Sequence, residues 1–283
     1  MMTDQARKLR ALRTRQRPVR TIAFTSGKGG VGKSTLVVNV GLVLARQGVR
    51  VGVFDGDLGL ANIDVLLGLT PKYTLRDVIE GDLELRDIMV PGPHGLQVLP
   101  ASSGIESLAN LDPDQRNQLV AKLTALEDLV DVLLVDTAAG ISSTVLSLVL
   151  ACQEAVVVTM PEPTALTDAY ALLKVVSQRN PNHPVRLLVN MADDQRQAEE
   201  TYLRIERVTN RFLFSRPSFA GYVVRDPCVS KAVQEQKPLT VYYPYAKATR
   251  CIHSLAQSLL ALPPAAQGIG GFWGKMATSA AAR

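Results

Sequence analysis

The chain of 283 residues has little cysteine and little histidine, three of each. The cysteines (Cys152, Cys228 and Cys251) are scattered, odd in number and without C-x-x-C spacing, which favours a reducing compartment and argues against an iron–sulfur cluster. The histidines are equally far apart, which argues against a metal site or a catalytic histidine. No apolar stretch is long enough to span a bilayer, and the N-terminus lacks an apolar signal core. These absences favour a cytoplasmic protein.

A glycine-rich loop is the most informative feature that is present. It joins an apolar segment to a helical pattern and fits the phosphate-binding P-loop, with the residues Gly27, Lys28, Gly29, Gly30, Val31, Gly32, Lys33, Ser34 and Thr35. Backbone N–H groups and the helix N-terminus of such a loop face the phosphates of a nucleotide. We therefore expect Lys33 to neutralise the β- and γ-phosphates of ATP and Ser34 to ligate Mg²⁺.

Two further segments carry acids directly after apolar strands. Asp57 follows the strand Val51-Gly52-Val53-Phe54, in a segment that resembles switch I of the MinD/ParA ATPases. The resemblance implies that a carboxylate here holds the attacking water in line with the γ-phosphorus. Asp136 follows the strand Val132-Leu133-Leu134-Val135 and is expected to hold Mg²⁺. Each segment is a weak signal alone, but three in this order at strand ends predict an ATPase.

Lys28, which the loop carries in addition to Lys33, indicates the class of ATPase. The arrangement K-G-G-x-G-K-[ST], with Lys28 early in the loop, resembles the deviant Walker A motif of the MinD/ParA ATPases. This resemblance implies a homodimer around two ATP molecules, in which Lys28 reaches the partner's nucleotide and takes part in catalysis. It also implies that Asn190 and Asp226 lie around adenine, although Val224 stands where the family's P-x-D segment has its proline.

The expected fold is a single α/β domain with a doubly wound, mainly parallel sheet and helices on both faces. The strands are predicted at 21–25, 50–54, 96–99, 131–135, 155–160, 185–189 and 219–224, and all except 96–99 precede a plausible helix. The domain itself is expected over 21–262, between a basic arm at 1–20 and a C-terminal tail at 263–283.

Charge concentrates in the arm, which has seven Lys or Arg and a single Asp, against a net charge of +5 for the whole chain. Such an arm can bind nucleic acid or anionic lipid, or remain a solvated tail. Its string Asp4-Gln5-Ala6-Arg7-Lys8-Leu9-Arg10 resembles the D-Q-A-x-x-L-R element of the FlhG/FleN regulators of flagellar number. The resemblance implies contact with the FlhF GTPase through Asp4, Gln5 and Arg10.

The tail carries apolar residues at i, i+3, i+4 and i+7, namely Ile269, Phe272, Trp273 and Met276. This spacing predicts one apolar helix face that could bind the inner-membrane surface, as tails of the MinD and FlhG families do, while four nearby glycines oppose a stable helix in water. A disordered tail, or a tail packed back on the domain, remains the alternative. Two tails in an ATP dimer would bind a membrane more strongly than one.

The resemblance to FlhG/FleN implies a regulatory ATPase that controls flagellar number or placement with FlhF and restrains a flagellar transcriptional activator. Two other functions stay open. One is a ParA/MinD-type ATPase that partitions DNA, division proteins or other cargo; the arm element and tail disfavour it, and we expect no specific DNA binding. The other is a bacterial tyrosine kinase, whose C-terminal tyrosine cluster is absent from this chain's C-terminus.

Overall fold

A single eight-stranded sheet organises the computed structural model, which describes residues 18–57, 63–81, 83–100, 120–213, 216–261 and 268–281. The strand order is β3-β4-β2-β5-β1-β6-β7-β8, parallel throughout except that β3 runs antiparallel to β4. The strands are β1 (Arg20–Ser26), β2 (Val51–Gly56), β3 (Val90–Pro91), β4 (Gln97–Pro100), β5 (Val132–Ala139), β6 (Glu154–Thr159), β7 (Val185–Ala192) and β8 (Ser218–Val224).

Seven of these strands lie where the sequence predicts them. The two-residue β3 was not predicted, because it is too short to show a periodic pattern. β5 and β7 also continue past their predicted ends, since Ala139 pairs with Ser26 of β1 and Ala192 pairs with Val224 of β8. The doubly wound α/β fold is confirmed.

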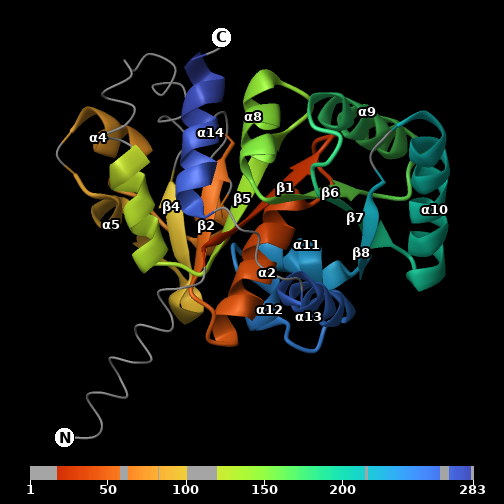
Figure 1. Cartoon of the computed structure of the whole chain (residues 1–283). Helices are drawn as coiled ribbons and strands as arrows, with labels where there is room; N and C mark the ends of the chain where they lie inside the picture. Colours follow the sequence, from red (N-terminus) through yellow and green to blue (C-terminus); the bar gives the residue numbers. More distant parts are fainter. Residues whose placement is uncertain are drawn as a thin grey trace, which may run out of the picture.

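Helices cover both faces of the sheet (Figure 1). One face carries α4 (Leu75–Glu80), α5 (Leu85–Ile88), α8 (Ser143–Ala151), α9 (Pro163–Arg179), α10 (Gln195–Phe212) and α14 (Ile269–Ala281). The other carries α2 (Lys33–Arg46), α3 (Ile63–Leu67), α11 (Pro227–Gln234), α12 (Leu239–Tyr242) and α13 (Lys247–Leu260). None of the helices in the described ranges is both long enough and apolar enough to cross a bilayer.

Two large hydrophobic clusters, one on each face, hold the layers together, and a small third cluster surrounds Val189. Along β5, Leu133 and Val135 belong to the cluster under α8 and α14, whereas Leu134 belongs to the cluster under α2 and α13. Alternate residues of a strand point to opposite faces, so a sheet covered on both sides needs apolar residues at every position. This requirement explains the continuous apolar runs of the predicted strands.

The C-terminal helix α14 belongs to the first of these clusters. Its residues Ile269, Phe272, Trp273 and Met276 are each no more than 2% exposed. Phe54 of β2 makes edge contacts with both aromatic rings, at 6.3 Å from Phe272 and 5.5 Å from Trp273 between centroids. The predicted tail thus includes a helix, α14, that packs into the core of the domain predicted over 21–262.

Candidate functional site

The P-loop lies between β1 and α2, at the carboxyl edge of the sheet. Gly30 and Gly32 have φ angles of 79° and 83°, a region that residues with a Cβ rarely adopt. Gly27 is required for another reason, because a Cβ there would lie 2.2 Å from the carbonyl oxygen of Asp168 in α9. The loop's shape thus depends on backbone freedom at two glycines and on close packing against α9 at a third.

Lys33 forms a buried ion pair with Asp136, which lies within β5. Their Nζ and Oδ1 atoms are 2.6 Å apart, and the two side chains are 8% and 0% exposed. Burial raises the pKa of Asp136, while the Lys33 ammonium and the neighbouring Ser34 hydroxyl lower it. The second carboxylate oxygen, Oδ2, is buried and has no hydrogen-bond partner among the described residues.

That orphaned oxygen provides a test of the expected Mg²⁺ site. An unpaired buried carboxylate oxygen is costly unless a cation or donor satisfies it. Asp136 and Ser34 supply the oxygen ligands that Mg²⁺ prefers, beside a loop suited to phosphate. The residues present therefore fit Mg²⁺ bound together with a nucleotide.

β2 contains an acid, Asp55, to which the sequence assigned no role. Asp55 is 4% exposed, and its two carboxylate oxygens accept hydrogen bonds from the backbone N–H groups of Asp57 (3.2 Å) and Ile63 (3.4 Å). Burial and the nearby Asp136 carboxylate raise the pKa of Asp55 to about 7. Asp55 thus binds the backbone at both Asp57 and Ile63, and it lies opposite Asp136 in the register of β2 and β5.

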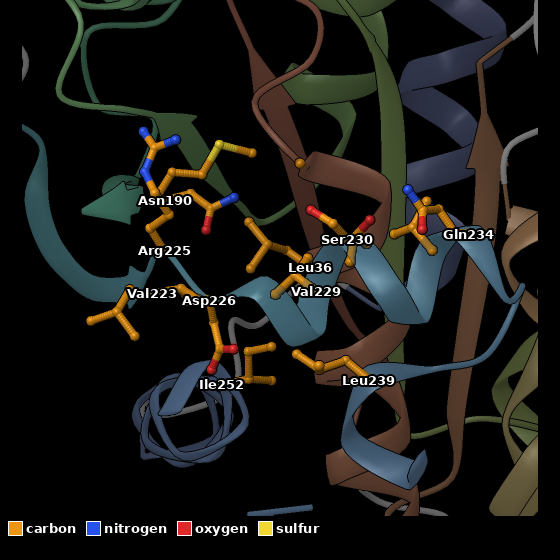
Figure 2. A pocket seen from close by; sticks show the side chains of 15 residues that line it. Leu36, Asn190, Val223, Arg225, Asp226, Val229, Ser230, Gln234, Leu239 and Ile252 are labelled. Atoms are coloured by element: carbon orange, nitrogen blue, oxygen red, sulfur yellow. The ribbon is translucent and has the colours of Figure 1, made fainter. Parts of the chain in front are cut away.

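Two adjoining cavities lead away from the P-loop. The first, of about 400 Å³, is lined by the loop from Gly29 to Thr35 and by Asp57. The second, of about 370 Å³, shares Gly32, Thr35 and Val233 with the first. It is lined mainly by apolar side chains of α2, α11 and β8, with Asn190 and Asp226 toward one end and Gln234 toward the other (Figure 2). This arrangement suits a nucleotide, with phosphates in the first cavity and the base in the second.

Asn190 lines the second cavity and also contacts the P-loop. Its side-chain Nδ2 donates a 2.7 Å hydrogen bond to the carbonyl oxygen of Val31, and a Cβ on Gly32 would lie 2.5 Å from this nitrogen. The amide therefore braces the P-loop. Nδ2 keeps a second N–H donor and Oδ1 can accept, so the amide can still form hydrogen bonds to a base.

Asp226, expected near adenine, lines the second cavity but acts as a helix cap. Its Oδ1 accepts from the backbone N–H of Cys228 (2.9 Å), and Oδ2 accepts from that of Ala248 (3.1 Å). These bonds lower the pKa of Asp226. One carboxylate thus joins the N-termini of α11 and α13, which positions the wall of the cavity.

Lys28 points away from the Lys33–Asp136 pair. Its Nζ lies 3.4 Å from Oε2 of Glu162 and 3.2 Å from Oγ1 of Thr164, both at the start of α9. The two lysines of the loop therefore have different surroundings, one buried beside an acid and one at the surface. Sequence reasoning missed Glu162 and Thr164, which carry no motif of their own.

The remaining predicted residues fall into two groups. Asp4, Gln5 and Arg10 lie outside the described residues. The four apolar residues proposed for membrane contact face the protein core instead, as described for α14, and the indole Nε1 of Trp273 has no hydrogen-bond partner among the described residues.

Comparison with known proteins agrees with this geometry. A family model described as ParA, NUBPL iron-transfer P-loop NTPase, matches residues 18–260. The antiactivator FleN of Pseudomonas aeruginosa is 45% identical over 246 residues, which cover 87% of this chain and 88% of FleN. The flagellum site-determining protein YlxH of Helicobacter pylori is 34% identical over 241 residues, 84% of this chain and 81% of YlxH.

A solved structure shows the same fold around a nucleotide. The septum site-determining protein MinD of Pyrococcus horikoshii, complexed with Mg-ADP, matches with a TM-score of 0.67 and 26% identity, covering 85% of this chain and 96% of that one. The loop, the orphaned acid and the two cavities of this chain suit such a ligand. The chain belongs to the ParA family of P-loop NTPases and is a MinD/ParA-type ATPase of the FlhG/FleN kind.

Proposed function

We propose that this protein is a regulatory ATPase that controls flagellar number by switching between a monomer and an ATP-bound homodimer. One observation carries the proposal: Lys33 faces Asp136 inside its own site, whereas Lys28 on the same loop lies at the surface. A surface lysine on a P-loop is available to the nucleotide of a second subunit. The names of the FleN and YlxH relatives support the flagellar role.

Exposed apolar residues near the site support pairing through this face. Val65 and Val233 line the phosphate cavity and are 52% and 42% exposed, and Ile141, which follows Gly140 after β5, is 49% exposed. Water-exposed aliphatic side chains around a polar site gain free energy when a partner covers them.

Each residue of the site has a separate role in ATP hydrolysis. Lys33 would hold the β- and γ-phosphates, and Ser34 and Asp136 would hold Mg²⁺, whose charge would neutralise phosphate oxygens. Asp57 orients the attacking water, and Asp55 fixes the backbone that carries Asp57. Lys28 from the second subunit completes the site, so that hydrolysis requires the dimer.

The same proposal includes three partners. The arm would contact an FlhF-type GTPase through Asp4, Gln5 and Arg10, and the dimer would restrain a flagellar transcriptional activator. The third is the cytoplasmic face of the inner membrane. Because the apolar face of α14 is buried against the domain, membrane binding through it requires α14 to leave the core. Co-sedimentation with anionic liposomes in ATP and in ADP tests this coupling.

The central experiment measures mass in solution with ATP and with ADP. We expect the wild type to dimerise only with ATP. Lys33→Ala should lose ATP binding, because it removes the charge that holds the phosphates, whereas Lys28→Ala should bind ATP and remain monomeric. A Lys28→Ala protein that dimerises in ATP as the wild type does would refute the shared site.

A further inference from the structure

A buried asparagine joins two walls of the second cavity, one from α2 and one from α12. Leu36 of α2 and Leu239 of α12 both line this cavity (Figure 2). Asn39 follows Leu36 by three residues on the same side of α2 and is 2% exposed. Its Oδ1 accepts hydrogen bonds from the backbone N–H (2.8 Å) and the hydroxyl (3.0 Å) of Thr240, the residue directly after Leu239. The two walls are therefore tied together by residues next to those that line the cavity.

Asn39 takes the place of a local cap for α12. The first backbone N–H groups of a helix have no partner within the helix, and Pro238 at the N-cap of α12 has no side-chain oxygen to accept from them. Oδ1 of Asn39 accepts from one of these groups instead. The Nδ2 atom of the same amide donates a 2.8 Å hydrogen bond to the carbonyl oxygen of Thr35, which lines both cavities. One side chain thus links the P-loop to a helix 201 positions away in the sequence.

We propose that Asn39 is a positioning residue for ATP binding, which holds the wall formed by α11 and α12 where it contacts the base. Asn39 itself lines neither cavity, so it acts through Leu239 and through the turn between the two helices. This inference rests on the proposed function, because it presumes that ATP binds with its base in the second cavity.

The turn between α11 and α12 carries strain that the contact with Asn39 offsets. Gln236 in this turn has a φ angle of 52°, a region that residues with a Cβ rarely adopt. Val233 and Gln234 before the turn and Leu239 after it all line the cavity. Without the hold of Asn39 on α12, the turn can relax and displace these side chains from the base.

The expected effect is specific to the base. Removing the amide leaves the buried N–H and hydroxyl of Thr240 without their acceptor, which shifts the equilibrium between ordered and displaced wall by about 5-fold to 150-fold. ATP must then re-order the wall when it binds, so its dissociation constant should rise by a factor in this range. The Thr35 carbonyl keeps its backbone hydrogen bond within α2, so the affinity of the P-loop for phosphate should not change.

The test compares ATP with inorganic triphosphate, which carries phosphates but no base. Calorimetry with Mg²⁺ measures both dissociation constants on the full chain. Asn39→Ala removes the amide, and Thr240→Val removes one of the two hydrogen bonds while keeping the side-chain shape. Thr201→Val is the matched control, because Thr201 is 3% exposed and its hydroxyl donates to the Gln197 carbonyl within α10. Thermal unfolding checks that each variant is folded.

We expect Asn39→Ala to weaken ATP binding by about 5-fold to 150-fold and Thr240→Val by about 2-fold to 13-fold, with inorganic triphosphate unchanged in both. In hydrolysis, both variants should raise the KM for ATP and keep kcat close to that of the wild type. Thr201→Val should bind both ligands as the wild type does.

Unchanged ATP affinity in the two variants, or an equal loss of ATP and inorganic triphosphate, would overturn the role of Asn39. If Asn39→Ala does not fold, Thr240→Val alone decides between these results. A wild type that binds ATP no more tightly than inorganic triphosphate would also overturn it, because the base would then contribute no affinity. A wild type that does not bind ATP would instead contradict the proposed function.

Discussion

The docking of α14 can be tested by tryptophan fluorescence, because Trp273 is the single tryptophan of the chain and packs against Phe54 of β2. We expect Phe272→Ala to loosen the helix. Phe272 is 2% exposed, and its ring packs 4.7 Å from the Trp273 ring between centroids. Truncating a buried phenylalanine costs about 3–5 kcal/mol. That loss corresponds to roughly two to three and a half orders of magnitude in the equilibrium between docked and released helix.

Tryptophan fluorescence measures the outcome without a label. In the wild type the buried indole should emit at short wavelength and resist quenching by acrylamide. In Phe272→Ala the emission should shift to longer wavelength and quenching should increase, well below the temperature at which the domain unfolds.

Gly274→Ala provides a matched control on the same helix. A Cβ on Gly274 would have no described heavy atom within 4 Å, and alanine favours a helix by about 1 kcal/mol over glycine. This variant should keep the emission at short wavelength. If Phe272→Ala showed wild-type emission and quenching, α14 would not depend on its aromatic contacts, and the reasoning would be refuted.

Three further predictions concern the nucleotide site. Asp57→Ala should retain ATP but hydrolyse it slowly, so gel filtration with ATP should show a long-lived dimer; normal hydrolysis would mean that another residue orients the water. Gly27→Ala should lower the melting temperature, because its Cβ would meet the α9 backbone, whereas Gly29→Ala, with no described atom within 4 Å of a Cβ, should melt as the wild type does. The pKa of Asp55 is raised to about 7, so between pH 4 and 7 the folded protein keeps a proton on Asp55 that the unfolded chain loses. The free energy of unfolding should therefore fall as the pH rises from 4 to 7, by up to about 4 kcal/mol. Asp55→Asn should flatten that fall in urea titrations of the nucleotide-free protein.

The sequence by itself determined the sheet and the phosphate site, because their signals are local. An apolar run, a glycine-rich loop and a following helix occupy adjacent residues, so their order along the chain already places Lys33 at a strand end. Asp136 follows the apolar run of another strand of the same parallel sheet and therefore meets Lys33 at the same edge. The doubly wound fold followed from the same pattern, except for β3, which is too short to have one.

Only the tertiary structure decided how distant segments use their side chains. The apolar stripe of α14 is the same whether it faces lipid or protein; the structure packs it beside Phe54, and this contact stabilises a helix that its glycines disfavour. Asp226 caps two helices because α13 begins beside α11, and Lys28 meets Glu162 because α9 begins beside the loop. These contacts join residues 22 to more than 200 positions apart, and no local pattern encodes such a pairing.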